Sequence, residues 1–225
     1  MKLIKQKVNE FFKKYGMDAD SIDLDRNCAI FMEEMNRGLA DNGGEGGQGG
    51  GLNGGQDGSP NGSSNDASSL LMIPTYIEME KELPVNEPVI AIDAGGTNFR
   101  VAVIHIDESK KIIIDDFKLW PMPGTKGEIG KEEFFDTMAS YIEPVINRSY
   151  KISFCFSYPA QILPNRDGRL IKFSKEVKVR DVEGELIGRN LLDALKKRGC
   201  TGEKSIIILN DTVATLLAGK AASPG

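Results

Sequence analysis

The chain has 225 residues, with 28 Lys and Arg against 33 Asp and Glu and a formal net charge of −5. An acidic chain is a poor nonspecific ligand for phosphate backbones, so nucleic acid is not an expected partner. The apolar fraction of 40% can support a folded core. No apolar run approaches the roughly 20 residues that a membrane helix needs, so a membrane is not an expected partner either.

The cysteines and the N-terminus favour a cytoplasmic protein. Cys28, Cys155 and Cys200 are widely spaced and form no CxxC pair, a pattern typical of reduced core thiols. Lys and Glu interrupt the apolar stretch that a signal peptide would need near the N-terminus, so secretion is not expected. The single histidine, His105, excludes a metal site built from several histidines.

Two helices are predicted within residues 1–40, the N-terminal helical segment. The apolar residues that recur at helical spacing are Leu3, Ile4, Val8, Phe11, Phe12 and Tyr15 in the first helix and Leu24, Cys28, Phe31, Met32, Met35 and Leu39 in the second. Gly16 is a candidate stop for the first helix, and Ser21 or Asp23 is a candidate cap for the second. We interpret each apolar stripe as a docking face.

Residues 41–69 are predicted to be a disordered linker, because they are almost entirely Gly, Asn, Ser, Gln and Asp and contain 11 of the 25 glycines. The globular pattern returns at residue 70, so residues 70–225 are predicted to form the main domain.

Three β-rich runs open this domain. They are residues 88–93 (PVIAID), 99–106 (FRVAVIHI) and 111–120 (KIIIDDFKLW). The connections between them are too short for helical crossovers, so the three strands are predicted to be antiparallel neighbours.

Helices and strands then alternate. The pattern predicts a helix over 131–147, a strand over 151–157, a helix over 185–198, a strand over 205–209 and a helix over 211–220. A strand reached across a helix is expected to run parallel to the first strand. The order predicts an α/β fold, a mixed five-stranded sheet with three antiparallel and then two parallel strands, which resembles a ribonuclease H-like domain.

The first candidate site is the octet at residues 93–100 (DAGGTNFR), which joins the first two predicted strands. Asp93 ends a strand and offers the oxygen ligand that Mg²⁺ prefers. Paired glycines let backbone N–H groups approach an anion closely, since no Cβ stands in the way. The residues predicted to surround bound phosphate are Gly95, Gly96, Thr97, Asn98 and Arg100. An ordinary Gly-Gly hairpin turn is the alternative interpretation.

The second candidate site is Asn210-Asp211, between the fifth strand and the last helix. Both residue types are good helix caps, which is one interpretation of the pair. The other is a carboxylate at the carboxyl edge of the sheet, where ligands of α/β proteins bind. There Asp211 could accept a proton from a substrate hydroxyl. The topology predicts that Asp93 and Asp211 face one cleft.

A third group of polar residues lies between these two sites. Ser157 ends the fourth predicted strand, and Ser174 and Lys175 follow an apolar run. Hydroxyls and a lysine suit a sugar or a phosphate. Taken singly, however, each fits a strand end or a solvated surface equally well.

Together these segments resemble the hexokinases. DAGGTNFR is similar to the first phosphate motif of that family. FSYPA, DGRLIKFSKEVKVRDVEGEL and ILNDTVATLLAG are similar to its sugar-binding segments and its catalytic Asn-Asp pair. MNRGL and LMIPTY add support near the N-terminus. The resemblance covers about residues 22–39 and 70–219.

The resemblance implies an ATP-dependent hexose kinase. Asp211 would be the general base that deprotonates the 6-hydroxyl of a hexose such as glucose, and Lys175 would touch both the sugar and the transferred phosphate. The implied sugar ligands are Ser157, Ser174, Lys175, Asn210 and Asp211. The 93–100 octet would surround the ATP phosphates, with Asp93 near Mg²⁺.

Some features depart from the family pattern. Ser174-Lys175-Glu176 stands where the family usually has Thr-Lys-Gly, so Glu176 adds a negative charge beside the lysine. No Gly-Thr-Gly, the phosphate turn of the family's second lobe, occurs in the sequence. Residues 70–225 are therefore expected to be the N-terminal, smaller lobe, with the second lobe absent and the 225-residue chain inactive alone.

Two alternatives to a catalytic lobe stay open. One is a non-catalytic half-kinase that binds sugar or a protein partner. The other is a metal-dependent nuclease, since this fold also hosts that chemistry. The acidic composition and the sugar-segment resemblance disfavour the nuclease.

Overall fold

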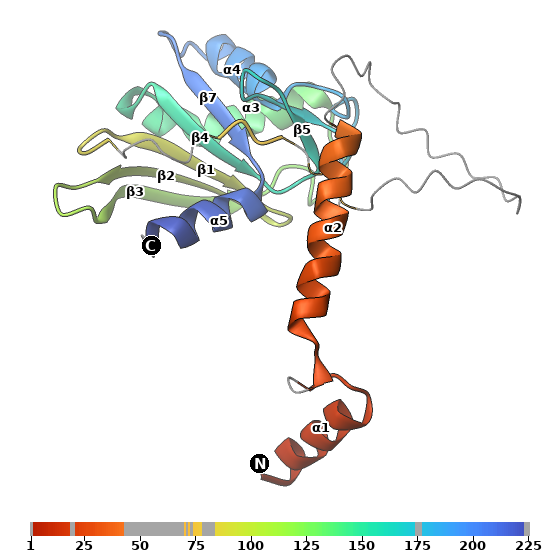
Figure 1. Cartoon of the computed structure of the whole chain (residues 1–225). Coiled ribbons are helices and arrows are strands. Elements are labelled where there is room, and N and C mark those ends of the chain that lie inside the picture. The colour runs from red at the N-terminus through yellow and green to blue at the C-terminus, as the bar shows by residue number, and fades with distance from the viewer. Residues whose placement is uncertain are drawn as a thin grey trace, which may run out of the picture. The chain divides into compact units, whose positions relative to one another are not determined.

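The computed structural model describes residues 2–18, 21–42, 70, 72, 74–77, 84–173 and 177–222 (Figure 1). The chain forms two compact units, Met1–Ile73 and Pro74–Gly225. Most of the predicted linker, residues 43–69, lies outside the described residues. None of the described helices is both long enough and apolar enough to cross a bilayer.

The N-terminal unit contains the two predicted helices, α1 (Lys2–Lys14) and α2 (Leu24–Asn42). Asp23 acts as the predicted cap of α2, because its carboxylate accepts a hydrogen bond from the Arg26 N–H at 2.9 Å. Cys28 is exposed on α2, so the prediction that all three cysteines are core thiols is wrong for this one. Helical periodicity finds an apolar stripe but does not say whether anything covers it.

The second unit is built on a five-stranded sheet with the order β3-β2-β1-β4-β7. Its strands are β1 (Val89–Ala94), β2 (Asn98–Ile106), β3 (Ile112–Pro121), β4 (Lys151–Phe156) and β7 (Ser205–Leu209). The first three strands pair antiparallel, whereas β4 pairs parallel with both β1 and β7. This confirms the predicted mixed sheet of the ribonuclease H-like fold.

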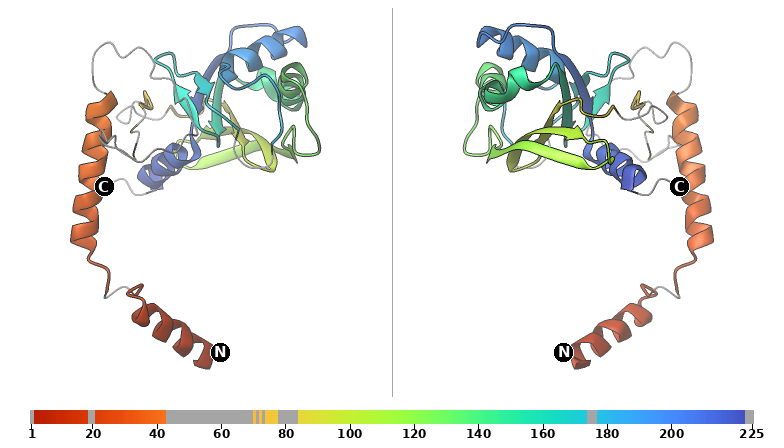
Figure 2. Two further views of the ribbon diagram at one scale, coloured as in Figure 1. Left: turned by 90° about the vertical axis from the view of Figure 1, so that its right-hand side faces the viewer. Right: turned by 90° about the vertical axis from the view of Figure 1, so that its left-hand side faces the viewer.

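Two helices cover one face of this sheet (Figures 1 and 2). These are α3 (Lys131–Ile142) and α4 (Ile187–Lys197). They bury alternate side chains of β1 and β4, such as Ile92 and Phe154, in a continuous apolar core. On each of these strands, the side chains at the intervening positions therefore face the other side of the sheet. The helix α5 (Asp211–Ala222) lies on that side (Figure 2).

The helix predicted over 131–147 is α-helical only as far as Ile142. A 3₁₀ helix, η2 (Glu143–Arg148), continues it and carries Pro144 in its first turn. Proline has no N–H and its ring clashes with the carbonyl four residues earlier, so an α-helix cannot run through this position undisturbed.

A short hairpin escaped prediction. Strands β5 (Ala160–Ile162) and β6 (Gly168–Leu170) pair antiparallel between β4 and α4. Three-residue strands are too short to show alternation in the sequence. The hairpin places Asp167, which is only 6% exposed, against the start of α4.

Candidate functional site

The predicted site residues gather at the carboxyl edge of the parallel strands. Asp93 on β1 is the register partner of Cys155 on β4, and Cys155 is the partner of Leu209 on β7. Neighbouring strands lie about 4.8 Å apart, so Asp93 and the end of β7 are about 10 Å apart across β4. Asn210 and Asp211 follow Leu209 directly. The two predicted carboxylates thus flank one strand end.

Both carboxylates affect the thiol of Cys155, which lies between them on β4. Burial, followed by the negative charges of Asp93 and Asp211, raises the pKa of the Cys155 thiol to about 11, and a hydrogen bond with Ser157 acts in the opposite direction. Both charges therefore act at one point between the strands. A common cleft for Asp93 and Asp211 stays a prediction, and the shared effect on Cys155 places both charges near the end of β4.

Asp93 is paired with Arg100 from the adjacent strand. The two are register partners on β1 and β2, and the Arg100 Nη1 donates to Asp93 Oδ2 at 2.6 Å. Each side chain is 41% exposed, so both remain accessible from solvent. The guanidinium is thus bonded to the carboxylate that was predicted to hold a metal ion.

The turn between β1 and β2, residues 95–97, is held from the protein side by several hydrogen bonds. The Gly95 N–H donates to the Asn98 carbonyl at 3.0 Å, and the Met122 N–H donates to the Thr97 carbonyl at 2.9 Å. The Tyr158 hydroxyl donates to the Gly95 carbonyl at 2.7 Å. These bonds fix the turn that sequence analysis assigned to phosphate.

Little in the described part of the chain crowds Gly95. A Cβ added at Gly95 would meet only the Asn98 carbonyl oxygen, at an ordinary contact distance of 3.7 Å. Packing among the described residues therefore does not require glycine at position 95. An anion that approaches the backbone closely would require it, so the turn fits the phosphate of a nucleotide.

Ser157 lies beside the same turn, immediately after β4. Its N–H donates to the Ala94 carbonyl at 3.1 Å, which continues the pairing of β1 and β4 past their ends. Ser174 and Lys175 lie outside the described residues. The residue before them, Phe173, donates its N–H to Glu183 Oε1 at 3.3 Å.

Asn210 caps α5 in the structure. Its Oδ1 accepts from the Thr212 N–H at 3.1 Å and from the Thr212 hydroxyl at 2.8 Å. Asp211 is the first residue of α5 and is exposed. Since a helix N-terminus favours a negatively charged side chain, the cap and the exposed carboxylate are compatible in this pair.

Sequence analysis did not find Tyr158 or Met122, which hold the 95–97 turn from residues distant in sequence. Tyr158 is fully buried, and burial raises the pKa of its hydroxyl to about 12. A tyrosine directly after a predicted sugar ligand was the one available signal. The Met122 contact is made by a backbone N–H, and side-chain patterns do not reveal such bonds.

The described residues contain no group of three or more His, Cys, Asp or Glu placed to hold a metal ion. Asp93 remains a single carboxylate at the turn. Mg²⁺ bound with a nucleotide usually takes one or two carboxylates and fills its other positions with phosphate oxygens and water. One carboxylate beside an open phosphate turn fits that arrangement.

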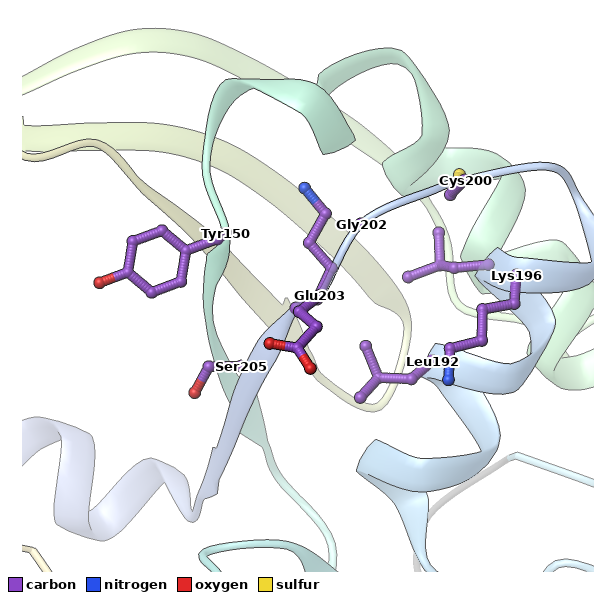
Figure 3. A pocket seen from close by; sticks show the side chains of 9 residues that line it. Tyr150, Leu192, Lys196, Cys200, Gly202, Glu203 and Ser205 are labelled. Atoms are coloured by element: carbon purple, nitrogen blue, oxygen red, sulfur yellow. The ribbon is translucent and has the colours of Figure 1, made fainter.

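A pocket of about 710 Å³ lies at the opposite edge of the sheet, at the start of β7 (Figure 3). Its lining residues include Tyr150, Leu192, Lys196, Cys200 and Glu203. Because Tyr150 precedes β4 and the candidate site follows it, this pocket is separate from the carboxylates.

The chain is similar to known proteins over most of its length. A family model described as Hexokinase matches residues 7–221. Hexokinase-1 of Schizosaccharomyces pombe is 32% identical over 161 residues, which cover 68% of this chain and 33% of that protein. Human Hexokinase-3 is 28% identical over 159 residues, which cover 68% of this chain and 17% of that protein. The chain therefore spans a third or less of the length of these relatives.

Solved structures agree with this similarity. A Schistosoma mansoni hexokinase complexed with glucose superposes with a TM-score of 0.58 at 27% identity, and the match covers 71% of this chain and 37% of that one. A second hexokinase crystal structure superposes with a TM-score of 0.61 at 19% identity over 88% of this chain and 43% of that one, which supports the fold.

Proposed function

Because the chain belongs to the hexokinase family, we propose that it supplies the phosphate turn and the catalytic carboxylate of an ATP-dependent hexose kinase. The observation that carries the proposal is that these residues lie together at the carboxyl edge of the parallel strands. The 95–97 turn and the Asn210-Asp211 pair flank the end of β4, where both Asp93 and Asp211 raise the pKa of Cys155. The glucose in the S. mansoni structure supports a hexose as the acceptor.

The chemistry is phosphoryl transfer, which depends on positioning and on neutralising charge. In the proposed reaction Asp211 accepts the proton of the sugar 6-hydroxyl. That oxygen bonds to the γ-phosphorus of ATP as the bond to the β-phosphate oxygen breaks, and ADP leaves. The ionised carboxylate needed for this step suits the first position of α5.

The remaining predicted residues position the two substrates. The open backbone at Gly95 and Gly96, with Thr97 and Asn98, would receive the phosphates. Ser157, Ser174, Lys175 and Asn210 would bind the sugar. Asp93 would hold Mg²⁺, which when bound neutralises charge on the transferred phosphate. Arg100 would then exchange its bond to Asp93 for one to phosphate.

We also propose that the 225-residue chain is nearly inactive alone and needs a second lobe or a partner to complete the cleft. The support is that the match covers 33% of the S. pombe protein, and that Asp211 and Thr97 are exposed. Water is not excluded from such a site, and exclusion of water strengthens the electrostatic interactions that phosphoryl transfer uses.

Two assays on the purified chain and its Asp211→Ala variant test the proposal. Calorimetry with glucose is expected to show binding that weakens at least about tenfold in the variant, the cost of losing one hydrogen bond to a charged group. Equal binding by both proteins, or none by the wild type, would contradict the assigned sugar site. A coupled assay for glucose 6-phosphate is expected to show no turnover. Turnover lost in the variant would instead mean that one lobe, or a dimer, suffices.

A further inference from the structure

Tyr158 lies between the 95–97 turn, the predicted phosphate site, and Phe173. Its ring centroid is 4.9 Å from that of Phe156 at the end of β4 and 5.2 Å from that of Phe173. Phe173 directly precedes Ser174 and Lys175 in the sequence. The Tyr158 side chain is fully buried, so its ring and hydroxyl have fixed surroundings.

The hydroxyl of Tyr158 bonds to the 95–97 turn. It donates to the Gly95 carbonyl at 2.7 Å. In a planar trans peptide the carbonyl and the following N–H point in opposite directions. Holding the Gly95 carbonyl toward Tyr158 therefore turns the Gly96 N–H to the other side of the turn, where a phosphate would approach.

Two successive residues, Ser157 and Tyr158, bind the end of β1 and the start of the 95–97 turn. Ser157 N–H bonds to the Ala94 carbonyl, and Tyr158 hydroxyl bonds to the Gly95 carbonyl. The pair that carries a proposed sugar ligand thus fastens the last residue of β1 and the first residue of the turn. Glycine has no side chain to restrict its peptide orientation, so an external bond has the larger effect here.

We propose that Tyr158 is a positioning residue with two separable parts: its hydroxyl orients the Gly95–Gly96 peptide for phosphate, and its ring packs against Phe156 and Phe173 next to the proposed sugar ligand Ser157. The inference rests on the proposed function of the turn. It goes beyond that function because it assigns a role to a side chain that contacts neither substrate.

The test compares the wild-type chain with Tyr158→Phe, which keeps the ring and removes the hydroxyl. Tyr150→Phe is the matched control, because Tyr150 precedes the same strand and is 59% exposed. In Tyr158→Phe, hydrogen exchange of the Gly95, Ser157 and Met122 amides is expected to rise about fivefold, the effect of one hydrogen bond. Exchange of the Cys200 amide, which is bonded to the Leu195 carbonyl, serves as the reference.

Ligand binding separates positioning from a general loss of stability. Calorimetry with Mg·ADP is expected to show about fivefold weaker binding in Tyr158→Phe, whereas glucose affinity changes less than about twofold because the ring remains. Tyr158→Leu, which loses both parts, is expected to weaken both ligands. Tyr150→Phe is expected to match the wild type throughout.

Unchanged exchange at the three turn amides would overturn the inference, and so would an equal rise at the Cys200 reference amide, since that indicates general destabilisation. If the wild-type chain bound no nucleotide, the proposed function of the turn would fail. The exchange comparison would still decide whether Tyr158 holds the turn, so the two failures are distinguishable.

Discussion

Asp167 is expected to carry an unusually large share of the stability of the second unit. Its carboxylate accepts three backbone hydrogen bonds: from Gly168 and Gly188 at 2.7 Å and from Arg189 at 2.9 Å. Gly188 and Arg189 are in the first turn of α4, whose own cap residue, Leu186, makes no side-chain cap bond. Asp167 therefore supplies the missing cap from the β5–β6 hairpin.

Replacement by alanine removes all three bonds. At about 1.5 kcal/mol for each bond to a charged group, the low end of the usual range, the three bonds sum to about 4.5 kcal/mol, whereas a single helix cap is worth about 0.5–2 kcal/mol. Since Asp167 is only 6% exposed, water replaces these bonds poorly, and we expect a loss of about 3 kcal/mol. That is a large part of the ~5–15 kcal/mol that stabilises a typical domain.

Urea unfolding followed by fluorescence measures this loss. The chain has one tryptophan, Trp120, whose ring stacks on Tyr141 at 4.7 Å, so its emission reports on the sheet and α3 together. Asp193→Ala is the matched control on α4. The Asp193 side chain is 48% exposed and its ion pair with Arg189 spans 3.5 Å, so its loss should cost less than about 0.5 kcal/mol.

Asp167→Asn should fall between these values, because it keeps one acceptor oxygen and places an amide donor near the Arg189 N–H. A loss below about 1 kcal/mol in Asp167→Ala would contradict the capping role of this carboxylate. It would mean that water or a neighbouring group satisfies the first turn of α4 without the carboxylate.

Three further outcomes are expected. Gly188→Ala should destabilise the chain by about 1–3 kcal/mol in the same urea assay, because its Cβ would lie 2.7 Å from a buried carboxylate oxygen, whereas Gly127→Ala, with no atom within 4 Å, should change stability by less than about 0.5 kcal/mol; equal effects would contradict this packing. The pKa of the Cys155 thiol in the folded chain is raised from 9.0 to about 11. The contribution of this thiol to the free energy of unfolding should therefore be fully present below pH 9 and should fall as the pH rises toward 11. Cys155→Ala should flatten this fall. Burial and both carboxylates suppress the Cys155 thiolate about 100-fold, so Asp93→Asn should accelerate its alkylation by iodoacetamide but leave the exposed Cys28 unchanged; an unaltered Cys155 rate would show that Asp93 does not act there.

The order and direction of the five sheet strands could be predicted because each strand is a run rich in β-branched or aromatic residues and each connection has a diagnostic length. The five-residue connection AGGTN (residues 94–98), for example, is too short for a helical crossover and requires a tight turn. The location of Asp211 followed from the same topology. The pairing of Arg100 with Asp93 did not, since it depends on the cross-strand register between β1 and β2.

Other features depend on contacts between distant residues, and local patterns do not reveal those. The cap of α4 comes from Asp167, about 20 residues before the helix, whereas a sequence search for caps inspects only adjacent residues. Tyr158 is a similar case, because its partner Gly95 is 63 positions away. The exposure of Cys28 was missed because the helical pattern around it is local and does not show whether another element covers that face.

In the proposed function, one edge of the sheet holds both a sugar site and a phosphate site. The most direct test is an amide chemical-shift titration of the isotope-labelled chain with glucose and then with Mg·ADP. Glucose is expected to shift the amides of Ser157, Asn210 and Asp211, and Mg·ADP is expected to shift those of residues 95–98. Shifts confined to the pocket beside Tyr150, or no shifts with either ligand, would contradict the proposed function.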